Sequence, residues 1–164
     1  MIRNAKPEDA VNIQRIYRHY VENTVISFEY VAPSVEEIER RIQHYQKNYP
    51  YLVLEEDGRV IGYAYGSRYR ERRAYDYTAE VSVYIDKDEL GKGYGKRLAL
   101  ELIEQLREKE IYTVIAILTS GNERSLALFL SLGFKLAGNL ANVGYKNGRW
   151  HGITELILPI KTYD

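Results

Sequence analysis

The stretch Leu90-Gly91-Lys92-Gly93-Tyr94-Gly95-Lys96-Arg97-Leu98 decides the fold, because three closely spaced glycines join a strand pattern to a helix pattern. Before it, residues 79–85 alternate apolar and polar side chains, which is the period of a half-buried strand. After it, Leu98, Leu102 and Leu106 recur every fourth residue and form one helical stripe. Glycines let backbone amides approach an anion closely, and the dipole at a helix start favours negative charge. The junction therefore predicts a diphosphate site.

The spacing of these glycines excludes the two common nucleotide loops. A dinucleotide fingerprint needs its third glycine one residue later than Gly95, and a P-loop needs a longer gap followed by Gly-Lys-Ser/Thr. A strand, Gly-x-Gly-x-Gly and a helix instead resemble the acyl-CoA diphosphate loop of the GNAT superfamily of N-acetyltransferases, whose usual pattern is Gln/Arg-x-x-Gly-x-Gly/Ala. Leu90 departs from this pattern because it has no polar head. A glycine-rich turn without a ligand is the alternative interpretation.

A second segment, from Asn122 to Phe134, supports the first. It resembles the GNAT segment Asn-x-x-Ser/Ala, helix, Leu-Gly-Phe/Tyr, in which the asparagine side chain reaches the pantetheine arm of CoA. Read without the resemblance, Asn122 and Ser125 are ordinary helix-start residues and Gly133 is an ordinary helix stop.

The resemblance implies an α/β (α+β) fold, a mixed and mostly antiparallel sheet flanked by helices, and residues 1–164 forming a single domain. The sequence pattern gives the same element order. Strands are expected near 1–5, 51–55, 60–69, 75–85, 113–118, 134–146 and 149–158, and helices near 7–22, 34–48, 93–109 and 122–132. Asp57-Gly58 and Asn147-Gly148 predict two tight hairpin turns. Only the strands on either side of the glycine-loop helix need to be parallel.

Composition limits the partners and the compartment. The 23 basic and 23 acidic side chains balance, so the chain carries no overall field that would favour nucleic acid or a membrane surface. No apolar run reaches the ~20 residues that span a bilayer, and the first residues do not resemble a signal peptide. The chain has no cysteine, and its three histidines lack metal-ligand spacing. We therefore expect a cytoplasmic protein without a bound metal.

Three further segments narrow the resemblance to one branch of the superfamily. Residues 25–29, 74–85 and 144–151 are similar to the phosphinothricin and methionine-sulfoximine acetyltransferases, and with the two segments above they cover nearly the whole chain. The resemblance implies that acetyl-CoA acetylates the α-amine of a small amino-acid-like substrate, often in a homodimer.

The resemblance also implies roles for individual residues. Glu80 matches the strand glutamate that accepts the proton of the amine; its alternative is a solvated or structural carboxylate. Backbone groups of the strand bind the pantetheine and polarise the thioester carbonyl. The residues expected to bind the cofactor are Val83, Tyr84, Ile85, Gly91, Lys92, Gly93, Tyr94, Gly95, Lys96, Asn122 and Ser125. The lysines among them have the alternative role of solvating a helix.

Phe28, Arg72 and Arg73 are the candidates for the substrate site, since a guanidinium suits a carboxylate or phosphinate. The arginines have the alternative role of a solvated surface cluster. Phe129 stands where the family often has a tyrosine or histidine that protonates the thiolate, and phenylalanine cannot donate a proton. CoA would then leave as a stabilised thiolate, or a tyrosine such as Tyr84 would serve. A peptide N-terminal or other small-amine acetyltransferase, and a non-catalytic acyl-CoA-binding module, remain as alternatives.

Overall fold

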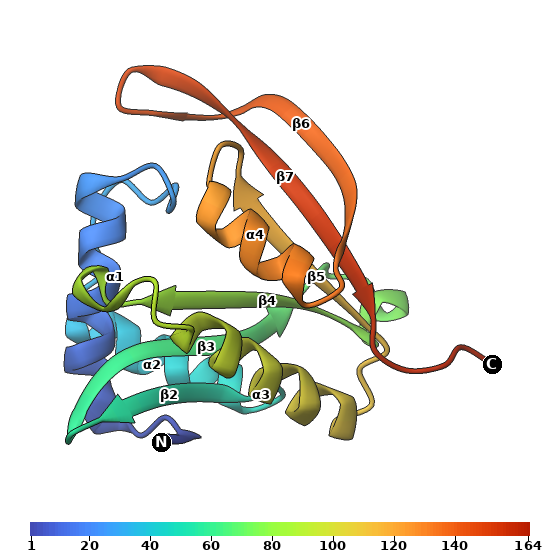
Figure 1. Ribbon diagram of the computed structural model, residues 1–164, viewed down its shortest axis with the longest axis horizontal. Coiled ribbons are helices and arrows are strands. Elements are labelled where there is room, and N and C mark those ends of the chain that lie inside the picture. The colour runs from blue at the N-terminus through green and yellow to red at the C-terminus, as the bar shows by residue number, and fades with distance from the viewer.

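The glycine loop lies between β4 (Thr78–Ile85) and α3 (Tyr94–Glu108), as the sequence predicts. Figure 1 shows the computed structural model, which describes residues 1–164. The remaining helices are α1 (Ala10–Asn23), α2 (Val35–Gln46) and α4 (Glu123–Ser131). The remaining strands are β1 (Ile2–Asn4), β2 (Tyr51–Glu56), β3 (Arg59–Arg68), β5 (Thr113–Thr119), β6 (Lys135–Lys146) and β7 (Arg149–Pro159).

All seven strands form one sheet in the order β1-β2-β3-β4-β5-β7-β6. Every neighbouring pair is antiparallel except β4 and β5. The parallel pair is joined through α3, because a parallel connection needs a crossover. The predicted mixed and mostly antiparallel fold is therefore confirmed, and β5 lies inside the sheet as a central strand.

The sheet splits between β4 and β5. These strands pair only from Thr78 to Glu80 against Thr113 to Ile115, and then they run in different directions (Figure 1). Beyond Glu80, the edge of β4 that faces β5 has no strand partner, although its other edge continues to pair with β3 as far as Ile85. This split opens the space in which the candidate site lies.

Two hydrophobic cores cover the two faces of the sheet. On one face, Leu98, Leu102 and Leu106 of α3 are fully buried in a core that also includes Phe129 of α4. On the other face, α1 and α2 pack over a core rich in stacked tyrosines. The rings of Tyr51, Tyr63, Tyr65 and Tyr84 form this stack, with centroids 4.7–6.3 Å apart. The periodic leucines of the sequence therefore bury α3 as expected.

The predicted turns form, but one predicted strand is too long. The two residues of each hairpin turn have positive φ angles, 52° and 76° at Asp57-Gly58 and 54° and 72° at Asn147-Gly148. The strand expected from residue 75 begins instead at Thr78, because the chain from Arg73 to Tyr75 forms a 3₁₀ turn. The segment before the key strand is thus a loop that projects its arginines into solvent.

Candidate active site

A cleft of about 260 Å³ runs along the split edge of β4, between the glycine loop and the start of α4. It brings together ten of the residues expected to bind the cofactor: Val83, Tyr84, Ile85, Gly91, Gly93, Tyr94, Gly95, Lys96, Asn122 and Ser125. Lys92 does not line the cleft, because its ammonium pairs with Glu89 at 2.6 Å. The cleft also has lining residues that were not among those expected to bind the cofactor: Tyr20, Ile26, Glu89, Leu90, Arg124 and Leu128.

The glycine loop presents free backbone amides to this cleft. Gly91 and Gly93 have φ angles of 78° and 81°, which side chains with a Cβ rarely adopt. The amide of Arg97 makes the first helical hydrogen bond, to the carbonyl of Gly93 at 3.2 Å. The amides of the first turn therefore have no acceptor within the helix, and together with the dipole they suit a phosphate.

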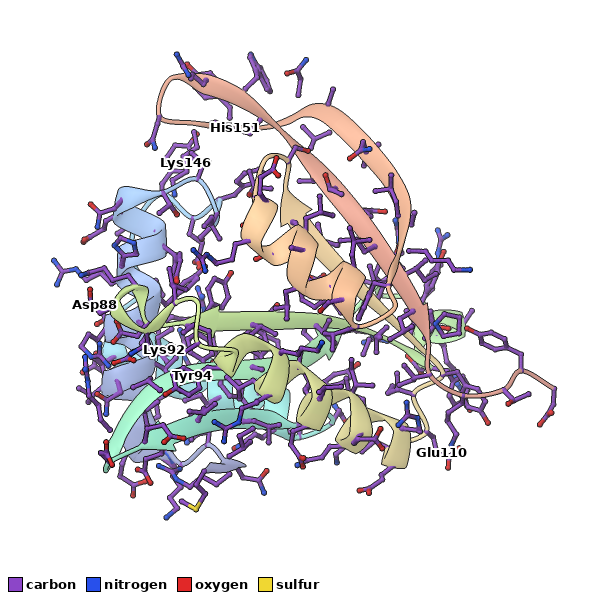
Figure 2. The ribbon with its side chains drawn as sticks, in the orientation of Figure 1. Asp88, Lys92, Tyr94, Glu110, Lys146 and His151 are labelled. Carbon is purple, nitrogen blue, oxygen red and sulfur yellow. The ribbon has the colours of Figure 1, made fainter.

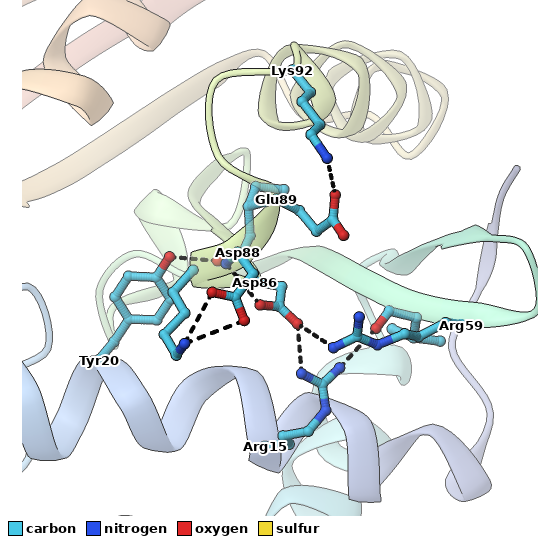
Figure 3. A network of polar contacts seen from close by, with 10 residues as sticks. Arg15, Tyr20, Arg59, Asp86, Asp88, Glu89 and Lys92 are labelled. Carbon is cyan, nitrogen blue, oxygen red and sulfur yellow. Dashed lines mark hydrogen bonds and ion pairs between the residues drawn. The ribbon is translucent and has the colours of Figure 1, made fainter.

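A polar network holds the strand end from which the glycine loop departs (Figure 3). Asp86 is buried, and its carboxylate accepts hydrogen bonds from Arg15 of α1 at 2.5 Å and Arg59 of β3 at 3.1 Å. Its other oxygen accepts from the amide of Asp88 at 3.0 Å. Burial acts to raise the pKa of Asp86, but these hydrogen bonds outweigh it and hold the pKa below its usual value. The network fixes the loop relative to α1 and β3.

A smaller cavity continues the cleft into the gap between β4 and β5. It shares Val83, Tyr84 and Ser125 with the cleft and adds the hydroxyls of Ser82 and Thr119. Phe129 forms part of its wall and is only 3% exposed. An extended ligand bound along the cleft from the glycine loop toward Glu80 would pass this cavity.

Glu80 lies at the point where β4 and β5 separate. Its side chain is half-buried, and burial followed by the charge of Glu155 raises the pKa of its carboxyl group. Glu155 lies on β7, opposite Ile117 of β5. Glu155 is not among the site residues predicted from the sequence, because β7 reaches the neighbourhood of Glu80 only through the pairing of both strands with β5.

The loop between α1 and α2 contributes Ile26 to the lining of the cleft and of the smaller cavity, and Lys146 fixes this loop (Figure 2). Lys146 is the last residue of β6, is 3% exposed, and donates hydrogen bonds to the carbonyls of Val21, Thr24 and Ser27 at 2.7, 3.0 and 2.7 Å. Thr119 of β5 donates to the carbonyl of Val25 at 2.7 Å. We call residues 24–30 the acceptor loop. The β6–β7 hairpin and β5 thus determine its conformation.

Phe28 of the acceptor loop packs beneath the β6–β7 hairpin. Its ring lies against Gly144 and is 6.2 Å from the ring of His151, centroid to centroid. A Cβ at Gly144 would lie 2.8 Å from Cδ2 and 2.9 Å from Cζ of Phe28. Because Gly144 has no side chain, the ring of Phe28 can occupy this space.

The arginines before β4 differ in their surroundings. Arg72 and Arg73 are exposed and form no ion pair, and Arg68 pairs with Asp76 at 3.3 Å. Arg70 lies over the rings of Tyr69 and Tyr75, at 5.0 and 5.9 Å from their centroids. Tyr69 and, more weakly, Glu155 raise the pKa of Arg70. Among these arginines, Arg70 is thus the one held against aromatic rings.

The split sheet, the glycine loop and the cleft between them define an acyl-CoA-dependent transferase fold. The family described as acetyltransferase (GNAT) domain matches residues 2–154. The chain belongs to the GNAT family and is an N-acetyltransferase that uses acetyl-CoA as its cosubstrate. No group of three or more histidine, aspartate or glutamate side chains could hold a metal ion. None of its helices combines the length and apolar character needed to cross a bilayer.

Named relatives resemble the chain over nearly its whole length. A phosphinothricin N-acetyltransferase of Alcaligenes faecalis is 39% identical, over 99% of this chain and 84% of the relative. An L-methionine sulfoximine/L-methionine sulfone acetyltransferase of Salmonella typhimurium is 34% identical, over 97% and 94%. The crystal structure of a phosphinothricin acetyltransferase from Sinorhizobium meliloti in complex with acetyl-CoA superposes with a TM-score of 0.93, at 38% identity over 97% and 87% of the two chains.

Changing Gly93 to valine should weaken CoA binding. A Cβ at Gly93 meets no protein atom within 4 Å, so a side chain there would extend into the space over the first-turn amides. Charge-assisted hydrogen bonds contribute about 1.5–3 kcal/mol each, so losing one or more should raise the Kd of CoA by at least about tenfold. Isothermal titration calorimetry measures this. Gly58→Val is the matched control, because Gly58 also has a positive φ and open surroundings but lies in the β2–β3 turn. Unchanged CoA binding in Gly93→Val would contradict the diphosphate assignment.

Changing Gly144 to alanine should displace Phe28 and raise the KM for the acceptor amine. The new methyl group would overlap the ring, and a well-packed site accommodates such a change only by moving side chains. CoA affinity should not change, because neither Gly144 nor Phe28 lines the cleft. Gly138→Ala in the same strand is the control, since a Cβ there meets nothing within 4 Å. An unchanged acceptor KM would show that Phe28 does not contact the acceptor.

Proposed function

We propose that this N-acetyltransferase acetylates the α-amine of a small amino-acid-like acceptor of the phosphinothricin or methionine sulfoximine type. The observation that carries the proposal is Glu80, a half-buried carboxylate with a raised pKa at the point where β4 and β5 separate. The names of the relatives support the acceptor class, since phosphinothricin and methionine sulfoximine are both amino acids.

In the proposed reaction, the diphosphate of acetyl-CoA binds the amides of the glycine loop, and the pantetheine follows the unpaired edge of β4. Val83, Tyr84 and Ile85 contribute backbone groups there, and Asn122 and Ser125 contact the arm from α4. A backbone N–H near Val83 or Tyr84 polarises the thioester carbonyl. Lys96 would contribute positive charge, whereas Lys92 has its charge already paired with Glu89.

Glu80 is the proposed general base. It removes a proton from the ammonium group, directly or through water, and the free amine attacks the carbonyl carbon of the thioester. The carbon–sulfur bond then breaks, the CoA sulfur takes the electron pair as a thiolate, and the nitrogen, which became positively charged on attack, releases its second proton to the thiolate or to water. Phe129 cannot protonate that thiolate. Tyr84 lines the cleft but is a poor acid, because burial raises the pKa of its hydroxyl well above the usual value.

The acceptor would lie between Phe28 and the arginines that precede β4. A guanidinium in this loop suits the carboxylate of an α-amino acid or a tetrahedral anionic side group. Arg72 and Arg73 are the arginines expected from the sequence, and Arg70, which lies over the rings of Tyr69 and Tyr75, is a third candidate. Comparing Arg70→Ala, Arg72→Ala and Arg73→Ala by their KM for an amino-acid acceptor identifies which of the three binds the anion.

A screen of acceptors tests the proposed function. Release of free CoA thiol is followed with acetyl-CoA and phosphinothricin, methionine sulfoximine, methionine sulfone, free amino acids, simple alkylamines and short peptides. We expect amino-acid acceptors to have the highest kcat/KM. Faster acetylation of alkylamines or of peptide N-termini would overturn the acceptor class and leave the acetyltransferase activity in place.

We further propose that the protein is a homodimer. The β6–β7 hairpin stands away from the rest of the sheet (Figure 1), and several of its large apolar side chains are exposed. They are Leu136, Leu140, Val143, Tyr145 and Trp150. Exposed apolar patches of this kind mark interaction surfaces. Sedimentation velocity at micromolar concentration tests the dimer, and a monomer throughout would overturn it.

The domain and the compartment are part of the same proposal. The participation of all seven strands in one sheet supports a single acetyltransferase domain over residues 1–164. The use of acetyl-CoA supports a cytoplasmic location. The chain also has no cysteine, so it forms no disulfide that would need an oxidising compartment. Fractionation of cells that express the protein tests the location.

A further inference from the structure

One arginine faces the glycine loop from the opposite wall of the cleft. Arg124 is the second residue of α4 and lines the cleft. A Cβ placed on Gly91 would lie 3.8 Å from Nη1 of Arg124, which is the only atom that it would meet within 4 Å. The guanidinium therefore reaches across the cleft from α4 to the loop that precedes α3.

The charge of Arg124 has no acidic partner. It forms no ion pair, whereas the one carboxylate that lines the same cleft, Glu89, is paired with Lys92. Burial and the charge of Asp86 raise the pKa of Tyr20 to about 12, and the charge of Arg124 acts against them. Tyr20 of α1 lines the same cleft as Arg124. An unpaired cation at the mouth of a cleft attracts an anion.

The glycine loop supplies amides to its ligand, and Lys96 is the one lysine of this segment that lines the cleft. Leu90 has an apolar side chain, and Lys92 is turned toward Glu89 (Figure 3). A diphosphate carries two negative charges, so a cation on the far wall of the cleft complements the amides on the near wall. The planar fork of a guanidinium can bind phosphate oxygens in bidentate fashion.

We propose that Arg124 binds the diphosphate of CoA from α4, opposite the amides of the glycine loop. Arg124 is then a cofactor-binding residue that connects the β5–α4 side of the split sheet to the β4–α3 side through the cofactor. The inference rests on the CoA position proposed above, and it adds a ligand for the diphosphate that the glycine loop does not contain.

Calorimetry of the intact protein with three ligands tests this assignment. The ligands are CoA, dephospho-CoA, which keeps the diphosphate but lacks the 3′-phosphate, and pantetheine, which lacks both. Losing one charge-assisted hydrogen bond to phosphate in Arg124→Ala should raise the Kd of CoA by about tenfold. The Kd of dephospho-CoA should rise by the same factor, and the Kd of pantetheine should not change. Arg124→Lys should restore part of the affinity, because lysine keeps the charge but not the fork. Arg149→Ala, which removes an exposed and unpaired arginine at the start of β7, is the control.

The three ligands give different outcomes. A loss that disappears with dephospho-CoA would assign Arg124 to the 3′-phosphate and overturn the proposal. An equal loss with pantetheine would mean that the substitution disturbs α4, which also overturns it. If Arg124→Ala binds CoA with wild-type affinity while Gly93→Val binds CoA weakly, the role of Arg124 alone is overturned. Wild-type affinity of both variants would overturn the position of CoA itself.

Discussion

Replacing Glu80 with glutamine is expected to lower kcat by about 10²-fold or more, the usual effect of losing a general base. Glutamine keeps the size of the side chain and one carbonyl oxygen, but it cannot accept the proton of the ammonium group. The affinity for CoA should remain as in the wild type, because Glu80 lines neither the cleft nor the smaller cavity beside it. Steady-state thiol release and CoA calorimetry together measure both quantities.

Glu71→Gln is the control for this change, since Glu71 is an exposed carboxylate in the loop before β4. It should leave both kcat and CoA affinity unchanged. Full turnover of Glu80→Gln from about pH 6 to about pH 9 would show that solvent takes the proton and that Glu80 has a structural role.

The pH dependence of the reaction gives an independent view of Glu80. A base works only when deprotonated, so activity should fall as the pH drops through the pKa of Glu80. Burial, and secondly the charge of Glu155, raise that pKa, so the acid limb should lie above the usual range of a glutamate. Glu155→Gln removes the second cause and should move the acid limb of kcat/KM to lower pH. A limb that stays in place would show that Glu155 does not influence the base.

Replacing Lys146 with methionine is expected to lower the free energy of unfolding by about 3 kcal/mol, since three buried carbonyls lose their donor. Burial also lowers the pKa of Lys146, so its charge is held in an unfavourable environment that these carbonyls and the nearby charge of Glu29 offset. Methionine keeps the length of the side chain and leaves the carbonyls at the end of α1 without a partner. The acceptor loop should then become mobile.

Chemical denaturation measures the stability of Lys146→Met, and steady-state kinetics measure its effect on the site. The KM for the acceptor should rise several-fold, whereas CoA affinity should not change, because the acceptor loop and not the glycine loop is released. Lys135→Met, at the exposed first position of the same strand, is the control and should alter neither quantity. Lowered stability with an unchanged acceptor KM would show that Lys146 supports the fold without ordering the site.

Local patterns in the sequence were sufficient for most of the fold. The two turns at Asp57-Gly58 and Asn147-Gly148 have the positive φ angles that their residues predict, and the leucines of α3 are buried as their spacing predicts. The start of β4 was wrong by three residues, because Tyr75 resembles a strand residue but lies in a 3₁₀ turn. A single aromatic residue cannot distinguish these two conformations.

The site was harder to predict, because its contacts join distant parts of the chain. Lys146 is 119 to 125 residues from the carbonyls that it binds, and no spacing rule connects them. β4 and β7 lie far apart in the sequence, and Glu80 and Glu155 come near each other because both strands pair with β5. Arg124 could have been found, since it lies between Asn122 and Ser125, but nothing in that motif shows that its side chain crosses to Gly91.

The split between β4 and β5 makes the ligand-free sheet open easily along one seam, the line between these two strands. Only three residue pairs hold the two strands together, and the amides beyond them on that edge of β4 have no strand to protect them. Such amides exchange their hydrogens with solvent through small local openings. A pantetheine arm laid along this edge acts as a substitute strand and closes the seam. The enzyme would then be most rigid while it carries its cosubstrate, and its melting temperature would rise with the supply of acetyl-CoA in the cell.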